Sequence, residues 1–228
     1  MFAAASTTGV LNAVLSRMEA PNIRVRVSYA SSGALARQIA AGAPAALYLS
    51  ANRKWIEWLE KKGKLTPTGK VRLFGNRLAL AAPAKSIANL KIQPGFPLRQ
   101  ALGDGRLAIA DPAHAPAGIY ARDALTKLGV WRDVADRTAR APNVLAALAL
   151  IERGEAPLGI VYRTDAFRNP KVRILDEFPA GSHDGISYLL ALTAPESDGA
   201  TALFAFLQSK AARRLYADYG FTAKDGAP

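Results

Sequence analysis

Serine residues stand at two places where a short apolar run gives way to a helical pattern. Ser6 follows residues 2–5, and Ser32 follows residues 25–30. Each arrangement predicts a strand, a tight turn and a helix. The first turn of a helix has unpaired N–H groups and a partial positive charge, so it attracts anions. Several helix starts that converge on one point would hold an oxyanion without any lysine or arginine.

A third strand–turn–helix arrangement spans residues 111–120 and offers backbone donors. It contains Pro116, Ala117 and Gly118 just before an amphipathic pattern. Proline suits the first turn of a helix, and glycine permits another group to approach closely. We therefore expect a helix start with accessible N–H groups at this point.

Two further candidate donors lie in the second half of the chain. Asn143 is typical of a helix N-cap, and it leaves the Val144 N–H free near the helix start. Tyr162 ends a buried strand over residues 158–162, and its phenol is a neutral hydrogen-bond donor. Each donor, taken alone, also has an ordinary structural interpretation. Serine before a helix is most often an N-cap, and a tyrosine at a strand end is most often part of the core.

Composition excludes several classes of site. The 228 residues contain no cysteine, which rules out disulfides, cysteine-ligated zinc and thiol catalysis. The two histidines, His114 and His183, have no companion at metal-ligand spacing. The net charge of +12 is dispersed, and its densest run, residues 61–64, follows a helical pattern that cations there would stabilise. A nucleic-acid partner is therefore not expected.

Catalytic motifs are absent from the sequence, and we expect a protein that is not an enzyme. There is no Ser-His-Asp set in a strand–turn–helix context, no nucleophile elbow, no phosphate-binding loop and no dinucleotide fingerprint. No run approaches the roughly 20 apolar residues of a membrane span. No charged tail or helix-turn-helix segment is present either.

Strands and helices alternate in two series, which indicates α/β architecture with mostly parallel, helix-covered sheets. The expected strands are 2–5, 24–29, 46–50, 77–82, 106–110, 158–162, 171–175 and 187–192. The expected helices are 10–18, 34–41, 54–61, 119–128, 144–153 and 200–219.

Two lobes joined by two strand crossings follow from this order. The first lobe comprises residues 1–79 and 183–228, and the second comprises residues 80–182. The strand over 187–192 has the right length to pair with residues 78–82. A cleft between the lobes, at the carboxyl ends of the strands, is the expected ligand site.

The chain resembles the periplasmic molybdate-binding proteins of ABC transporters through nearly its whole length. The matching strings are short, but their order and spacing together are highly specific. They are FAAAS at 2–6, YASS at 29–32, LARQI at 35–39, GAPA at 42–45, DP at 111–112, PAGIYA at 116–121, AALAL at 146–150, EAPLGIVY at 155–162 and YGF at 219–221. One departure is Ala46, because the family usually has aspartate after the GAPA string.

The resemblance implies a type II periplasmic-binding fold that closes on a tetrahedral dianion. It implies that Ser6 and Ser32 donate through hydroxyl and backbone N–H groups, that Ala117 and Val144 donate backbone N–H groups, and that Tyr162 donates its phenol. These residues would contact the oxygens of the anion, with none ligating the metal directly.

Molybdate is the implied ligand, with tungstate as a second, and an ABC permease is the implied partner. The resemblance also implies a periplasmic protein whose signal peptide is missing from this chain, a monomer, and no cofactor. Three alternatives stay open at this point: a ligand-sensing module on the same fold, a binding protein for another oxyanion, and a transferase that binds a phosphorylated substrate.

Overall fold

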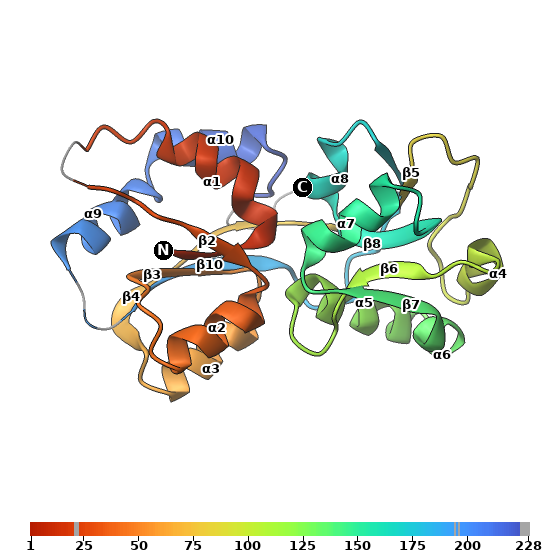
Figure 1. Ribbon diagram of the computed structural model, residues 1–228, viewed down its shortest axis with the longest axis horizontal. Helices are drawn as coiled ribbons and strands as arrows, with labels where there is room; N and C mark the ends of the chain where they lie inside the picture. Colours follow the sequence, from red (N-terminus) through yellow and green to blue (C-terminus); the bar gives the residue numbers. More distant parts are fainter. Residues whose placement is uncertain (21–22, 194, 196, 224–228) are drawn as a thin grey trace. The chain divides into compact units, whose positions relative to one another are not determined.

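The chain folds into two compact units, each built on a five-stranded sheet (Figure 1). The computed structural model describes residues 1–20, 23–193, 195 and 197–223. Unit 1 comprises Met1–Gly75 and Ile186–Pro228, and unit 2 comprises Asn76–Gly185. The chain therefore crosses from one unit to the other twice.

The sheet of unit 1 has the strand order β2-β1-β3-β10-β4. Its strands are β1 (Phe2–Ala4), β2 (Ser28–Ala30), β3 (Leu47–Ser50), β4 (Leu65–Gly75) and β10 (Ser187–Thr193). The first three strands run parallel, and β10 lies antiparallel between β3 and β4. The carboxyl ends of β1, β2 and β3 consequently lie at one edge of this sheet.

The sheet of unit 2 has the order β7-β6-β8-β5-β9 and repeats the same plan. Its strands are β5 (Leu78–Pro83), β6 (Leu107–Ala110), β7 (Thr138–Ala141), β8 (Leu158–Tyr162) and β9 (Val172–Glu177). Here β6, β7 and β8 run parallel, and β5 lies antiparallel between β8 and β9. The loops after the three parallel strands again share one edge of the sheet.

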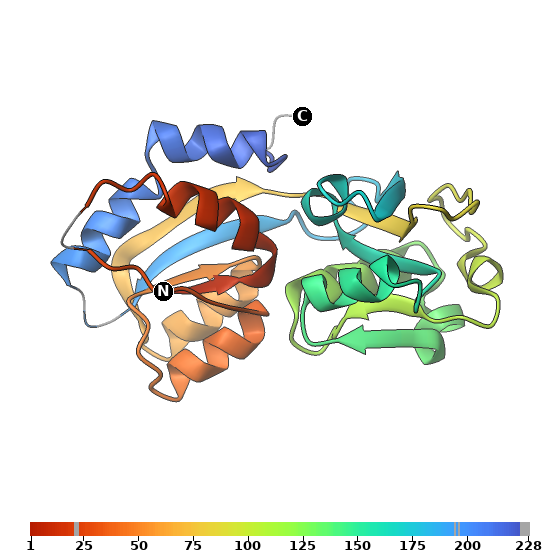
Figure 2. The ribbon, with the colours of Figure 1, turned by 45° about the horizontal axis from the view of Figure 1, so that its top comes forward.

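Helices cover both faces of the unit 1 sheet. They are the 3-10 turn η1 (Ala5–Thr7), α1 (Thr8–Leu15), α2 (Ser32–Ala40), α3 (Arg53–Lys61), α9 (Asp198–Phe206) and α10 (Lys210–Asp218). The pair α1 and α10 lies on one face and the pair α2 and α3 on the other (Figure 2). Buried Leu35, Ile56 and Leu59 pack against Tyr48 of the sheet.

Unit 2 carries shorter helical segments around its sheet. They are α4 (Leu98–Leu102), α5 (Pro116–Lys127), α6 (Trp131–Val134), the 3-10 turn η2 (Ala135–Arg137), α7 (Val144–Glu152) and α8 (Arg163–Phe167). Both α5 and α7 contact β6 and β8. The strands β6 and β8 are completely buried, as their near-continuous apolar sequences indicate.

The expected pairing of residues 187–192 with residues 78–82 is wrong. Strand β10 pairs with β3 and β4 inside unit 1, while β5 pairs with β8 and β9 inside unit 2. Each sheet therefore contains two parallel and two antiparallel pairings and is mixed rather than mostly parallel. Apolar strands that are buried on both faces carry little local information about which neighbour they choose.

Other differences concern element boundaries and weak sequence signals. The eleven-residue strand β4 was not expected, because Pro67, Gly69 and register shifts against β10 interrupt its alternation. The single helix expected over 200–219 is two helices, since Ser209 caps α10 by accepting a hydrogen bond from the Ala212 N–H. The strand expected over 24–29 is only the short β2. Strand β7 and the short helices α4, α6 and α8 were also missed.

Candidate functional site

Ser6 lies at the edge of the unit 1 sheet, in the turn η1 that directly follows β1. Its hydroxyl is 2.7 Å from the hydroxyl of Tyr188 on β10, and its side chain is half-buried. Neither η1 nor α1 has a side-chain cap, so Ser6 is not an N-cap. The hydroxyl is instead held by a buried tyrosine from a strand far away in sequence.

Ser32 is the first residue of α2, which follows strand β2. Because Ala30 of β2 pairs with Ala4 of β1, Ser32 and Ser6 both follow strand ends at the same edge of the sheet. The residue is buried, and its Oγ accepts a hydrogen bond of 3.1 Å from the Ala51 N–H. Its backbone oxygen accepts a hydrogen bond of 2.7 Å from the Tyr48 hydroxyl. Ser32 therefore fixes the start of α2 to β3 and to the residue that follows it.

Ala117 is the second residue of α5, which follows β6 in unit 2. Pro116 occupies the first helical position, as expected from the sequence. A Cβ at Gly118 would lie only 2.0 Å from the backbone oxygen of Ala110. The glycine therefore lets the start of α5 pack directly against the carboxyl end of β6, which places the Ala117 N–H at the edge of the sheet.

Val144 is the first residue of α7, and Asn143 caps this helix by accepting a hydrogen bond of 3.0 Å from the Ala146 N–H. The N-cap expected from the sequence is confirmed. Strands β6 and β7 end together, with Ala110 opposite Ala141. The starts of α5 and α7 therefore follow adjacent strand ends in the same unit.

Tyr162 ends β8, the other parallel neighbour of β6, as expected from the sequence. It is buried, and it pairs with Leu78 of β5. Arg163 begins α8 immediately after it. The structure thus gathers Ala117, Val144 and Tyr162 at one edge of unit 2, and Ser6 and Ser32 at one edge of unit 1.

All five positions carry neutral donors. None is a lysine, arginine or histidine, so a ligand here would be held by dipoles and not by opposite charge. Within the part of the chain that the structure describes, no group of three or more acidic or histidine side chains could hold a metal ion. The arrangement suits an anion that needs hydrogen-bond donors, and it offers no ligand set for a metal cation.

Ala46 lies away from these loops. It immediately precedes β3, whereas the candidate residues of unit 1 follow the carboxyl ends of β1 and β2. Its backbone oxygen accepts a hydrogen bond of 3.1 Å from the Thr193 N–H. The alanine therefore stands at the opposite edge of the sheet from Ser6 and Ser32.

Asp165 is a buried carboxyl group beside the candidate site that the sequence reading missed. It is the third residue of α8, and its carboxyl accepts a hydrogen bond from the Tyr162 backbone. Its Oδ2 atom has no hydrogen-bond partner among the described residues. Burial raises the pKa of Asp165 well above its usual range, and the Tyr162 contact opposes this only in part. An acidic residue three positions after a strand end is a capping signal that could have identified it.

We expect the contribution of Asp165 to the free energy of unfolding to decrease as the pH rises above about 4. The unfolded Asp165 ionises near that pH, whereas the folded carboxyl keeps its proton to a higher pH. The contribution of this one group approaches about 1.4 kcal/mol per pH unit where the two states differ by a full proton. Asp165→Asn should remove this slope. Urea unfolding of both proteins between pH 4 and 7 tests it, and parallel pH profiles would contradict it.

Comparison with known proteins gives a consistent result. The family model of bacterial extracellular solute-binding proteins matches residues 1–222. The chain is 43% identical over 228 residues to the molybdate-binding protein ModA of Haemophilus influenzae, covering 98% of this chain and 89% of the relative. It is 39% identical over 227 residues to ModA of Escherichia coli, covering 98% and 88% respectively.

Solved structures share the fold at lower identity. The periplasmic molybdate-binding protein of Azotobacter vinelandii superimposes with a TM-score of 0.83 at 22% identity, covering 97% of each chain. The sulfate-binding protein SubI of Mycobacterium tuberculosis gives a TM-score of 0.78 at 19% identity, covering 99% of this chain and 86% of the other. The expected two-lobed α/β fold class is thereby confirmed. The chain belongs to the family of bacterial extracellular solute-binding proteins.

Proposed function

We propose that the protein binds molybdate and delivers it to an ABC permease in the periplasm. The observation that carries this proposal is the set of neutral donors at the helix starts and strand ends of both units. The near-full-length similarity to two molybdate-binding proteins supports the choice of ligand. The protein acts as a binding component, not an enzyme, and it requires no cofactor.

The proposed ligand contacts combine both units. Ser6 and Ser32 donate hydrogen bonds from unit 1, and Ala117, Val144 and Tyr162 donate them from unit 2. Each donor follows the carboxyl end of a parallel strand, where helix starts provide oriented N–H groups.

The donor chemistry selects a fully ionised tetrahedral anion. Molybdate near neutral pH has only acceptor oxygens, so every contact with a donor is satisfied. A protonated phosphate carries O–H groups that must donate hydrogen bonds. A site made only of donors has no acceptor for them, so they stay unsatisfied once water is excluded. Tungstate has the same charge and a similar shape, and we propose it as a second ligand. Sulfate is smaller, so its oxygens reach fewer donors at once.

Calorimetric titration tests the function directly. Purified protein is titrated with molybdate, tungstate and sulfate in a buffer free of other oxyanions. We expect one-to-one binding of molybdate and tungstate, with sulfate much weaker. Sulfate binding tighter than molybdate would replace the proposed ligand, and the absence of any binding by a folded protein would reject the proposal.

We propose that the protein works in the periplasm with the permease as its partner. The proposal assigns no role to a membrane-spanning segment of this chain. Among the residues that the structure describes, none of the helices has the length and apolar character that a bilayer crossing requires. The excess of basic residues raises the local concentration of anions near the protein through long-range attraction. Faster association with molybdate at low salt is the expected consequence.

Tyr162→Phe should weaken molybdate binding by about tenfold to a hundredfold, because it removes one hydrogen bond to a charged ligand. Tyr216→Phe is the matched control. Its hydroxyl donates a hydrogen bond of 2.8 Å to the Leu207 backbone oxygen in unit 1, which is not a proposed ligand contact. The control should lower the unfolding free energy by about 1 kcal/mol and leave affinity unchanged. Equal affinities of both variants and the wild type would remove Tyr162 from the site.

A further inference from the structure

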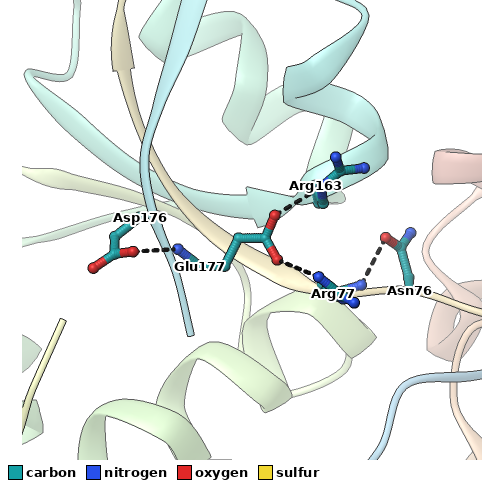
Figure 3. Close-up of polar contacts among 5 residues, drawn as sticks. All are labelled: Asn76, Arg77, Arg163, Asp176 and Glu177. Atoms are coloured by element: carbon teal, nitrogen blue, oxygen red, sulfur yellow. Dashed lines mark hydrogen bonds and ion pairs between the residues drawn. The ribbon is translucent and has the colours of Figure 1, made fainter. Parts of the chain in front are cut away.

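Five polar residues form a connected group where the chain enters unit 2, and Figure 3 draws all of them except Thr164. We call it the Glu177 cluster. Its members come from the start of β5, the start of α8 and the end of β9. They are Asn76, Arg77, Arg163, Thr164 and Glu177.

Glu177 joins the three chain segments through its carboxylate. Its Oε1 accepts a hydrogen bond of 2.7 Å from the Arg163 Nε, and its Oε2 lies 3.1 Å from the Arg77 Nη1. The side chains of Glu177 and Arg163 are each 31% exposed, and that of Arg77 is 47% exposed. Partly exposed ion pairs of this kind add little to stability, so the geometry they impose is their more significant effect.

The first two residues of unit 2 are fixed to the start of α8 by additional bonds. The Asn76 Nδ2 donates a hydrogen bond of 2.9 Å to the Thr164 Oγ1, and the Asn76 Oδ1 accepts one of 2.8 Å from the Arg77 N–H. The Arg163 N–H donates a hydrogen bond of 2.9 Å to the Arg77 backbone oxygen. The turn from β8 into α8 is therefore attached to the point at which the chain leaves unit 1.

Tyr162 lies inside this turn. It immediately precedes Arg163, and it stands opposite Leu78, which immediately follows Arg77. The two residues share a peptide bond, so a displacement of the Arg163 backbone is transmitted to the backbone of Tyr162. The Glu177 cluster thus controls the backbone on the C-terminal side of one proposed ligand contact.

We propose that Glu177 is a positioning residue that aims the Tyr162 phenol at the oxyanion by holding Arg163 and Arg77 in place. This inference rests on the proposed function, since it assigns a role toward the same ligand. Glu177 touches no proposed ligand contact itself, and it acts through the turn that carries Tyr162.

A purely Coulombic role for Glu177 would have the opposite effect. The carboxylate is negative, and it repels an anionic ligand in the same unit. Its neutralisation would therefore tighten anion binding if charge alone mattered. Loss of positioning would weaken binding, so the sign of the change separates the two explanations.

The test is calorimetric titration of Glu177→Gln with molybdate, beside Asp176→Asn as a matched control. The control removes the same charge from the adjacent residue. The Asp176 carboxylate accepts hydrogen bonds from two backbone groups, 2.9 Å from the Ile92 N–H and 3.1 Å from the Glu177 N–H, rather than from Arg77 or Arg163, and the asparagine keeps an acceptor oxygen for one of them. We expect Glu177→Gln to weaken binding by about three- to tenfold. Asp176→Asn should leave affinity equal or slightly higher.

The same substitution in a Tyr162→Phe background identifies the route of the effect. Glu177→Gln should then cause no further loss, because the hydroxyl that it positions is gone. Arg163→Gln breaks the same contact from the other side, and it serves if Glu177→Gln does not fold. Arg163→Gln alone should also weaken molybdate binding. In the Tyr162→Phe background it should have no effect on affinity beyond that of its change of charge.

Three outcomes would overturn the inference while the wild type binds molybdate. They are unchanged or tighter binding by Glu177→Gln, an equal loss in Asp176→Asn, and an undiminished loss in the Tyr162→Phe background. A wild-type protein that fails to bind molybdate would instead reject the proposed function, and this inference would fall with it. The wild-type titration therefore distinguishes the two failures.

Discussion

Gly118→Ala is expected to reduce molybdate affinity by at least a hundredfold. The new Cβ would lie 2.0 Å from the backbone oxygen of Ala110, 2.6 Å from its carbonyl carbon and 2.8 Å from the carbonyl carbon of Asp111. These backbone atoms end β6 and cannot turn aside as a flexible side chain can. The start of α5 must therefore move away by on the order of an ångström to restore ordinary contact distances.

That displacement would carry the Ala117 N–H out of reach of a bound anion. A hydrogen bond of about 2.9 Å lengthened by about an ångström is no longer a hydrogen bond. Neighbouring N–H groups of the first turn of α5 would move with it, so more than one interaction weakens. The overpacking should also lower the unfolding free energy by about 1–3 kcal/mol.

Gly199→Ala is the matched control for this substitution. Gly199 lies in the first turn of α9, and a Cβ there would meet no atom within 4 Å. Alanine is the better helix former, so the control should keep full affinity and gain a few tenths of a kcal/mol up to about 1 kcal/mol in stability. Titration and urea unfolding of both variants provide the comparison. A folded Gly118→Ala protein with wild-type affinity would show that the start of α5 is not a ligand contact.

Local signals made parts of the fold predictable from the sequence. The strand expected over 158–162 coincides with β8, and the Asn143 cap begins α7 as expected. The run of Pro116, Ala117 and Gly118 correctly indicated a helix start. Each of these depends on residues within one turn or one strand, which fix backbone dihedrals and caps without help from the rest of the chain.

Strand neighbours could not be predicted in the same way. Strands β5 and β10 are both short, apolar and almost completely buried, so each fits equally well beside several partners. Which partner a strand takes depends on the packing of the whole unit, as the separate sheets of β5 and β10 show. The parallel strands β1, β3, β6 and β8 were each expected close to their observed bounds, whereas the parallel strand β7 was missed.

The candidate site likewise has a part that was predictable from local sequence and a part that was not. Positions at strand ends followed from local pattern, whereas the contacts of their side chains did not. Ser6 meets Tyr188 across 182 positions of sequence, and Arg77 meets Glu177 across 100. The burial of Asp165 was also not predictable, since it depends on tertiary packing, although its capping position was visible in the sequence. The assignment of the five ligand contacts stays a prediction that the substitutions described here test.

Val144→Pro should likewise reduce molybdate affinity by at least a hundredfold, through the loss of one backbone donor together with the steric block by the proline ring. Val144 is the first residue of α7, a position that proline favours in helices. The preceding Asn143 has φ −155° and ψ 176°, an extended conformation that the residue before a proline readily adopts. The helix should therefore form normally while the N–H at its start is replaced by a bulky ring carbon. That carbon both removes the hydrogen bond and occupies the space nearest the anion.

Val144→Ala separates the donor from the side chain. It removes most of the buried valine but keeps the N–H group, so it should lower stability by about 1–3 kcal/mol with little change in affinity. Lys210→Pro provides a second control, because Lys210 is the first residue of α10 behind the N-cap Ser209, far along the chain from any proposed contact. It should bind molybdate as the wild type does. If Val144→Pro and Val144→Ala lose affinity equally, the side chain rather than the backbone donor at this helix start holds the ligand in place.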